Sequence, residues 1–250
     1  MISIQHEVVS GIPVLNVAPA DKMNEKLPTV IFYHGWTNYK ESVLVNGYEL
    51  AKRGFRAILP EAYLHGERKE SELVEEKYME FWEVVLANIK ELPLLHQHYL
   101  EKGLLDAERF GVTGLSMGGI TTCAMLTQFD FIKAAVCLMG SPAPMEFSKW
   151  LLQSSWATGT KIPADTVEQI GQLAPIDLSV QPEKINGRPV HFWHGTADEL
   201  VPYKPTKDFY EHIKNEPYAK NVSFTTSKGV GHRVPYLTSV EMAEFFEKVL

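Results

Sequence analysis

Short apolar runs alternate with amphipathic helical patterns along most of this 250-residue chain. Strands that alternate with helices build right-handed βαβ units, whose strands form a parallel sheet covered by helices on both faces. A chain of this length supplies one large domain of that kind. The sequence therefore predicts a single α/β domain over residues 1–250. We expect strands at residues 29–33, 55–59, 110–115, 134–139, 189–193 and 222–226, and helices between them, including 41–53, 117–127 and 206–213.

The two ends of the chain carry recognisable element boundaries. Residues 4–9 and 12–17 alternate between apolar and polar side chains, and Ser10-Gly11 joins them. This pattern predicts a hairpin of two antiparallel strands at a sheet edge. Near the other end, Thr238-Ser-Val-Glu241 resembles a capping box, which opens many helices. We expect the terminal helix to begin there and to run to Val249.

The longest helical pattern is followed by a proline. Residues 72–91 place apolar side chains three and four positions apart, which predicts an amphipathic helix. Pro93 lacks a backbone N–H, so we expect it to break or kink this helix, with a second piece that runs to Lys102. Gly103 then caps that piece, because glycine readily adopts the left-handed backbone that ends many helices.

Residues 141–181 interrupt the alternation. They hold no convincing strand, but they contain Trp150, Trp156, several prolines and short helical pieces. Insertions on parallel sheets collect at the carboxyl ends of the strands, where functional sites also lie. We therefore expect a cap over the active-site mouth, inserted within the single domain. The alternative is a plain connecting pair of helices.

Composition and charge narrow the possible partners. The chain is 45% hydrophobic and 22% charged, as in ordinary globular proteins, and its net charge is −7 without a long run of Lys or Arg. Such a chain is a poor partner for nucleic acid or an anionic membrane. It shows no signal peptide and no apolar stretch of about 18 residues, so we expect a soluble cytoplasmic protein. Cys123 and Cys137 lie in apolar runs, which predicts buried free thiols.

The strongest chemical signal is Gly114-Leu-Ser-Met-Gly118. In the pattern G-x-S-x-G the serine occupies a strained turn between a strand and a helix, which exposes its hydroxyl. A side chain at either flanking glycine would collide with neighbouring backbone. An expected strand ends at Leu115 and an expected helix begins at Met117, which is the context that the motif requires. We therefore predict Ser116 as a nucleophile.

A serine hydroxyl needs a base that takes its proton and an acid that orients the base. In chains with this turn the order is serine, acid, histidine. Asp198 follows the expected strand at 189–193, which places it at the sheet edge that carries Ser116. Asp208 lies in a helical pattern instead, and Asp177 either caps a helix or lines the pocket. We predict Asp198 as the acid.

Two histidines follow Asp198 in the chain. His212 lies among charged residues on a short helical pattern and is predicted to be a surface residue. His232 ends the segment Lys228-Gly-Val-Gly-His232, whose glycines allow a loop to bend toward the site. We predict His232 as the general base.

The transition state of acyl transfer develops a negative oxygen, which two preorganised N–H donors can hold. We expect one donor from the backbone of Met117 and the other from the loop after residues 29–33, where Trp36 is the best candidate. His34 is predicted to be structural, with its ring hydrogen-bonded to the loop, and His194 is assigned the same role. No pair of histidines has the spacing and carboxylate neighbours of a zinc site, so we expect no metal and no other cofactor.

The segment His65-Gly-Glu-Arg68 follows the expected strand at 55–59 and should lie at the same edge of the sheet. Two interpretations stay open. His65 helps to shape the substrate pocket, or the segment is a loop held by a salt bridge of Glu67 or Arg68.

Taken together, four segments resemble the dienelactone-hydrolase and prolyl-oligopeptidase-like branch of the α/β hydrolases. Within that branch the chain is similar, over nearly its whole length, to small single-domain bacterial carboxylesterases of the YjfP and YitV type. One departure is Ser116, because dienelactone hydrolases proper have cysteine at the nucleophile. The four segments are Phe32-Tyr-His-Gly-Trp-Thr37, His65-Gly-Glu-Arg68, Gly114-Leu-Ser-Met-Gly-Gly119 and His194-Gly-Thr-Ala-Asp198.

The resemblance implies an α/β-hydrolase fold with an eight-stranded, mostly parallel sheet and the hydrolysis of short-chain carboxylic esters. It implies that Ser116, Asp198 and His232 form the catalytic triad and that the backbone N–H groups of Trp36 and Met117 are the oxyanion donors. The expected partner is a small-molecule ester. Two alternatives stay open: a peptidase, amidase or thioesterase with the same triad, and a non-catalytic binding protein with the same fold.

Overall fold

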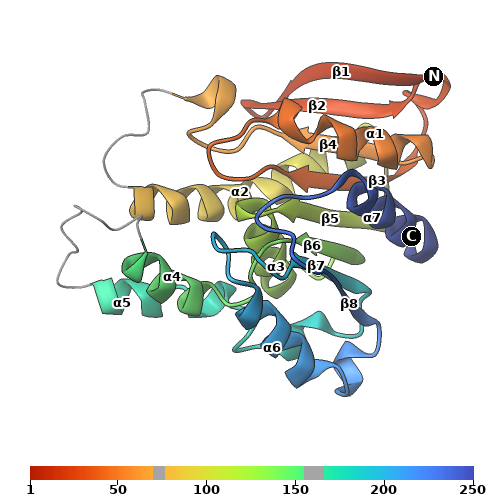
Figure 1. Cartoon of the computed structure of the whole chain (residues 1–250). Helices are drawn as coiled ribbons and strands as arrows, with labels where there is room; N and C mark the ends of the chain where they lie inside the picture. The colour runs from red at the N-terminus through yellow and green to blue at the C-terminus, as the bar shows by residue number, and fades with distance from the viewer. Residues whose placement is uncertain (70–76, 155–165) are drawn as a thin grey trace.

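The computed structural model describes residues 1–69, 77–154 and 166–250. These residues contain one eight-stranded sheet with the strand order β1-β2-β4-β3-β5-β6-β7-β8 (Figure 1). The six strands from β3 onward pair in parallel, which confirms the predicted α/β class. The strands are β1 (Ile2–Val9), β2 (Ile12–Pro19), β3 (Leu27–Tyr33), β4 (Arg56–Pro60), β5 (Leu105–Leu115), β6 (Ala134–Leu138), β7 (Val190–Gly195) and β8 (Val222–Ser227).

The first two strands add an antiparallel edge to this sheet. β1 pairs with β2 across a turn at Ser10 and Gly11, whose φ angles are 51° and 83°. Two consecutive residues with positive φ are what a two-residue hairpin turn of type I′ requires. β2 then pairs antiparallel with β4, which leaves β1 at the edge. The predicted edge hairpin is therefore confirmed.

Successive side chains of β3 point to opposite faces of the sheet and join two separate cores. Ile31 and Tyr33 pack under α2 and α3, whereas Val30 and Phe32 pack under α1 and α7. Figure 1 shows α1 and α7 together on one face of the sheet. The helices of the described residues are α1 (Leu44–Lys52), α2 (Lys77–Glu101), α3 (Met117–Gln128), α4 (Pro144–Gln153), α5 (Thr166–Gly171), α6 (Tyr203–Ile213) and α7 (Tyr236–Val249).

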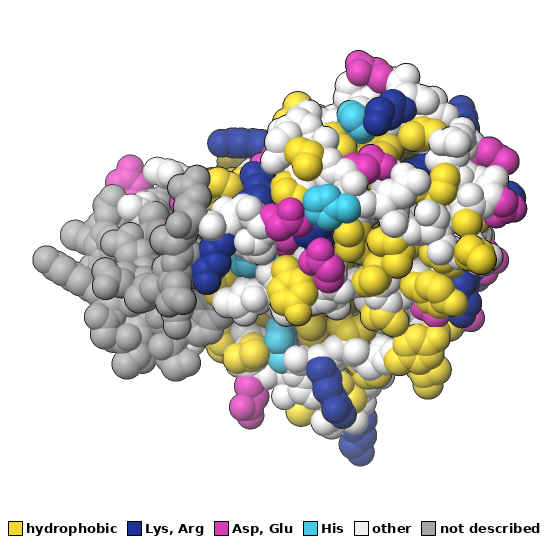
Figure 2. Space-filling view, turned by 90° about the horizontal axis from the view of Figure 1, so that it is seen from above, with side chains coloured by type: hydrophobic (Ala, Val, Ile, Leu, Met, Phe, Trp, Pro, Cys, Tyr) yellow, Lys and Arg dark blue, Asp and Glu magenta, His cyan; other side chains and the backbone are white. Residues whose placement is uncertain are grey.

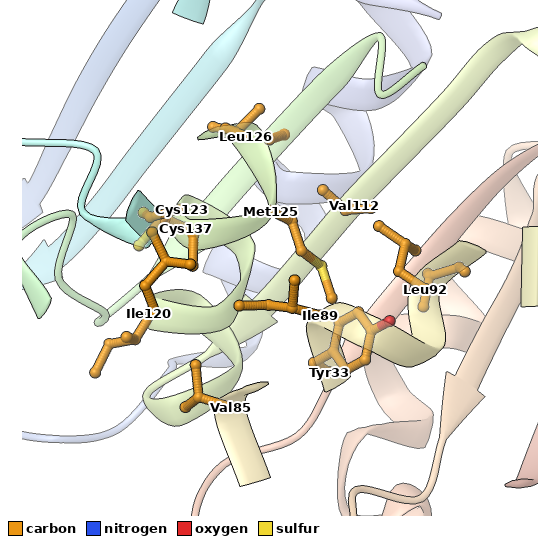
Figure 3. Packing of buried hydrophobic residues seen from close by; sticks show 14 of the residues in the cluster. Tyr33, Val85, Ile89, Leu92, Val112, Ile120, Cys123, Met125, Leu126 and Cys137 are labelled. Atoms are coloured by element: carbon orange, nitrogen blue, oxygen red, sulfur yellow. The ribbon is translucent and has the colours of Figure 1, made fainter. Parts of the chain in front are cut away.

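The larger core lies between the sheet, α2 and α3. Figure 3 shows Val85, Ile89 and Leu92 of α2 beside Met125 of α3 and Tyr33 of β3, and all five side chains are buried. Full burial of one such aliphatic side chain contributes roughly 1.5–3 kcal/mol to folding. This core fixes α3, and with it the turn that precedes α3, against the sheet.

Pro93 does not break the helix, because α2 runs through it from Lys77 to Glu101. A proline inside a helix costs about 3 kcal/mol, since it removes one backbone hydrogen bond. The buried side chains on either side of it, Leu92 and Leu95, belong to the larger core and offset that cost. Residues 72–76 of the predicted helix lie outside the described residues.

The terminal helix begins earlier than its capping box predicts. α7 starts at Tyr236, and its N-cap residue, Pro235, makes no side-chain hydrogen bond to the helix. Thr238 and Ser239 are instead buried inside the helix, where Ser239 Oγ accepts a hydrogen bond from Asn46 of α1. Packing against α1 therefore outweighs the local capping signal.

The segment 141–181 contains α4 and α5, and its described residues hold no strand. Residues 155–165 of this predicted cap, with Trp156, lie outside the described residues. Among those described, no helix combines the length and the apolar character needed to cross a membrane. Figure 2 shows the face on the β1 side, where described cationic and anionic side chains are interspersed.

Candidate active site

Ser116 occupies the turn between β5 and α3, with φ at 56° and ψ at −117°. Residues other than glycine rarely adopt a positive φ. A Cβ on Gly118 would lie 2.1 Å from Tyr33 O, and one on Gly114 would lie 2.5 Å from the backbone of Gly118. The predicted strand-to-helix turn, and its need for both flanking glycines, are therefore confirmed.

Loops after β7 and β8 bring Asp198 and His232 to Ser116. His232 Nε2 lies 2.8 Å from Ser116 Oγ, and His232 Nδ1 lies 2.7 Å from Asp198 Oδ2. An ionised carboxylate can only accept, so Nδ1 carries the proton and Nε2 accepts the serine hydroxyl. The structure thus joins these three side chains, which were singled out from the sequence, in one chain of hydrogen bonds.

The Asp198 carboxylate is held on both of its oxygens. Oδ1 accepts the backbone N–H groups of Leu200 and Val201, each at 3.0 Å. Burial by itself would raise the pKa of Asp198, but hydrogen bonds from His194, His232 and the Val201 backbone lower that pKa well below its usual value. The carboxylate is therefore ionised at neutral pH and can stabilise a positive charge on His232.

The loops that carry Asp198 and His232 pack directly against each other. The Ala197 N–H donates to Val230 O at 3.0 Å, and a Cβ on Gly195 would lie 2.3 Å from that oxygen. β7 and β8 are paired up to Gly195, so both loops leave the sheet at the same level. Parallel pairing of β7 with β8 and a glycine at the contact together set the distance between Asp198 and His232.

His194 makes a contact that the sequence analysis missed. Its ring is fully buried, and its Nε2 lies 2.9 Å from Val201 O and 3.2 Å from Asp198 Oδ2. The ring therefore bonds its loop, as predicted, but it also touches the carboxylate of Asp198. The four-residue spacing between His194 and Asp198 across a tight turn is the signal that could have indicated this contact.

The loop after β3 approaches Ser116 through Gly35. A Cβ on Gly35 would lie 3.0 Å from Leu115 Cδ1 and 3.5 Å from Ser116 Cβ, so the loop backbone lies close to Ser116. Trp36 follows in that loop, and Met117 is the first residue of α3, where backbone N–H groups have no partner within the helix. The two residues predicted as oxyanion donors thus flank Ser116.

His65 does not reach the cavity, because its ring lies behind the Trp36–Thr37 loop. Its Nε2 lies 3.0 Å from the Thr37 N–H and its Nδ1 lies 2.8 Å from Tyr63 O. The pocket interpretation of His65 is therefore replaced by a contact with the loop. The salt-bridge interpretation is confirmed for both residues: Arg68 bonds Glu91 at 2.6 Å and 2.9 Å, and Glu67 pairs with Lys40.

Ser116 opens into a cavity of about 300 Å³ at the carboxyl edge of the sheet. Its walls come mainly from the loop after β3, α2, α4 and the loop after β7. Apart from Ser116 and His232, the described residues that line it have no charged side chain: Gly35, Trp36, Thr37, Asn38, Phe81, Leu115, Met139, Phe147, Leu200 and Val201.

The other sequence candidates lie elsewhere. Asp177 is buried and accepts the Met145 N–H at 2.9 Å, so it caps α4 and does not line the cavity. Asp208 forms an ion pair with Lys204 on α6, and His212 is exposed on the same helix. In the part of the chain that the structure describes, no group of three or more His, Cys, Asp or Glu residues could hold a metal ion.

The sequence model of the prolyl oligopeptidase family matches residues 87–249. A Bacillus subtilis (strain 168) protein named "Putative esterase YitV" is 42% identical over 255 residues, and the alignment covers 100% of both chains. Esterase YjfP of Escherichia coli (strain K12) is 28% identical over 94% of each chain. The crystal structure of TT1662 from Thermus thermophilus has a TM-score of 0.79 at 20% identity, covering 99% of this chain and 98% of that chain.

These similarities agree with the geometry. The family match spans the strand-to-helix turn and both loops that meet Ser116. The first relative extends over the full chain, and the solved structure has the same fold at low identity. This chain belongs to the prolyl oligopeptidase family and is an enzyme of the serine hydrolase superfamily.

Proposed function

We propose that this protein is a serine carboxylesterase that hydrolyses short-chain carboxylic esters through an acyl-enzyme on Ser116. The observation that carries the proposal is the hydrogen-bonded chain Asp198–His232–Ser116, which ends in a small apolar cavity. The names of the two relatives, both esterases, support the same reaction class.

In the acylation half, Ser116 Oγ attacks the ester carbonyl carbon as His232 Nε2 takes the hydroxyl proton. The carbonyl π electrons move onto the oxygen, which the backbone N–H groups of Trp36 and Met117 hold. Asp198 keeps the imidazole in its reactive tautomer and stabilises its charge. His232 then gives the proton to the departing alkoxide, and the alcohol leaves.

In the deacylation half, water takes the place of the alcohol. His232 removes a proton from the water, whose oxygen attacks the acyl carbon of the Ser116 ester. The second tetrahedral intermediate collapses, the proton returns to Ser116 Oγ, and the carboxylic acid leaves. A preorganised oxyanion donor contributes about 3–4 kcal/mol to each of these transition states.

The described residues that line the cavity favour an ester substrate over a peptide. Its lining includes no Asp, Glu, Lys or Arg, so the described walls offer no charge to pair with a peptide terminus. Phe81 and Phe147 instead provide apolar surface for a short acyl chain or alcohol. We also propose that residues 141–181 act as a cap within the single domain, because α4 contributes Phe147 to the cavity wall. A cytoplasmic location stays a prediction.

A substrate panel tests the proposal. Purified protein is assayed against p-nitrophenyl esters of increasing acyl length, aminoacyl anilides and acyl thioesters, with Ser116→Ala as the control. We expect the short-chain esters to be cleaved fastest and Ser116→Ala to be inactive. Anilides or thioesters cleaved faster than every ester would overturn the ester claim. Failure of a fluorophosphonate to label Ser116 in folded protein would favour a non-catalytic binding protein.

A further inference from the structure

The loop that carries Trp36 is docked on the loop that follows β4. At its start, His34 Nε2 lies 3.1 Å from the Ala62 N–H. At its far end, the Lys40 backbone N–H donates to Glu61 at 3.1 Å and the Lys40 ammonium donates to the same carboxylate at 3.2 Å. These contacts are buried, so the two loops form one rigid unit beside Ser116.

Thr37 is the strained point of this unit. Its φ is 62°, which is unusual for a β-branched residue, and backbone in such a region costs on the order of 1–3 kcal/mol. The conformation persists only where neighbouring groups hold it. Two hydrogen bonds do so: Thr37 Oγ1 donates to Trp36 O at 2.7 Å, and the Thr37 N–H donates to His65 Nε2 at 3.0 Å.

The partners of His65 define its protonation. Tyr63 O can only accept, so His65 Nδ1 carries a proton, and the Thr37 N–H can only donate, so Nε2 has none. The ring must therefore be neutral. Burial lowers the pKa of His65 to about 4, which keeps it neutral at the pH of most assays. The same ring also lies edge-on against the Trp36 indole, with 4.9 Å between centroids.

We propose that His65 is a positioning residue for the oxyanion hole. By accepting the Thr37 N–H and packing against the Trp36 ring, it fixes the peptide unit between Trp36 and Thr37 and the side chain of Trp36. The Trp36 N–H then has one orientation relative to Ser116 before the substrate binds. This inference rests on the proposed function, because it assigns to His65 the support of a donor used in acyl transfer.

Two variants separate the hydrogen bond from the packing. His65→Phe keeps a flat ring against Trp36 but removes the acceptor, and His65→Gln supplies a side-chain oxygen that can accept the Thr37 N–H. His191→Phe is the matched control, because His191 also has its pKa lowered to about 4 by burial but lies on β7 and bonds Ser223 and Thr225. Thermal melts confirm that each variant is folded.

Kinetics on a p-nitrophenyl ester give the main readout. We expect His65→Phe to lower kcat about 10- to 100-fold with KM changed less than about threefold, because a misplaced donor weakens the transition state more than the bound substrate. His65→Gln should recover most of this loss, and His191→Phe should retain wild-type kcat. An unchanged kcat in folded His65→Phe, or equal losses in His65→Phe and His65→Gln, overturns the proposal.

The rate at which a fluorophosphonate labels Ser116 separates this inference from the proposed function. Labelling also builds negative charge on an oxygen beside Ser116, but it does not depend on which substrate the enzyme uses. If wild type is labelled yet cleaves no ester, the ester proposal fails, and slower labelling of His65→Phe than of His65→Gln still supports His65. Equal labelling rates of wild type and His65→Phe contradict it.

Discussion

At the scale of single residues, the two oxygens of Asp198 have different partners. Oδ1 accepts two backbone N–H groups, and Oδ2 faces His232 and His194. An asparagine amide at this position would place its oxygen at the two backbone donors, which leaves its NH₂ group facing His232 Nδ1. His232 would then carry its proton on Nε2, where it cannot accept the Ser116 hydroxyl.

Asp198→Asn should therefore lower kcat for ester hydrolysis by about 10³- to 10⁴-fold, the effect of a base held in the wrong tautomer. Steady-state kinetics at neutral pH measure it. Asp208→Asn is the control, because Asp208 is an exposed residue of α6. A loss below tenfold in Asp198→Asn would argue against Asp198 as the acid of the triad.

The buried carboxyl group of Glu61 makes the stability of the fold depend on pH in the acid range. Burial opposes its ionisation, but its contacts with His34 and Lys40 lower the pKa of Glu61 from 4.5 to about 2. A carboxyl with a lowered folded-state pKa stabilises the protein above pH 4.5, and this stabilisation is lost as the pH falls toward 2. The shift corresponds to a contribution on the order of 3 kcal/mol.

Glu61→Gln should remove that contribution. The difference in unfolding free energy between wild type and variant should be constant above about pH 5 and shrink between about pH 4.5 and 2. Urea unfolding at a series of pH values measures it. Glu211→Gln is the matched control: the pKa of Glu211 is also about 2, because of Lys207 and Lys214, but this group is exposed and screened by solvent. A pH-independent difference for Glu61→Gln would contradict the prediction.

At the scale of elements, local patterns predicted where most strands and helices lie, and distant contacts changed some boundaries. The strand-to-helix turn at Ser116 depends on Gly114 and Gly118, two residues away on either side, so the sequence could predict it. The start of α7 depends on packing against α1, and α2 continues through Pro93 because both sides of the proline are buried in the core. Such contacts join residues far apart in the chain, so no local pattern encodes them.

The N-terminus of α4 is another case, because its cap comes from a residue 32 positions later. Asp177 Oδ2 accepts the Met145 N–H, and Oδ1 accepts the Ser179 N–H at 2.9 Å. Asp177→Ala would leave these partly buried N–H donors without their acceptor, so we expect a loss of roughly 1–3 kcal/mol in unfolding free energy. KM should also rise, because α4 carries Phe147 into the cavity.

Urea unfolding and ester kinetics test this pair of effects. Asp177→Asn keeps one carbonyl acceptor and should lie between Asp177→Ala and wild type in both measurements. If Asp177→Ala unfolds at the wild-type urea concentration, Asp177 does not stabilise α4 in the way the contacts indicate.

At the scale of the whole molecule, the reactivity of the two buried cysteines measures how often the folded core opens. Cys123 on α3 and Cys137 on β6 are both free and at most 1% exposed, as the sequence indicated for buried thiols. Burial, with Cys137 beside it, raises the pKa of the Cys123 thiol well above its usual value. Both features oppose reaction with a thiol reagent while the protein is folded.

We expect both native thiols to react with a chromogenic disulfide reagent only as fast as the core opens. An Asp21→Cys variant supplies an exposed thiol for comparison. The native thiols should react at least about 10³-fold more slowly than that thiol, and two thiols per chain should react at once in denaturant. Fast labelling of Cys123 or Cys137 in native buffer would show that this core opens locally.

The sequence alone predicted the class of fold, the turn at Ser116 and the order in which Asp198 and His232 follow it. These depend on periodicity, on glycines at fixed offsets and on the direction of parallel strands, all of which are local or topological. Only the tertiary structure decided that His194 contacts Asp198, that Asp177 caps α4 and that His65 accepts the backbone N–H of Thr37. Each of these roles depends on which side chains face one another after packing, and the distance between two buried groups is set by the whole fold.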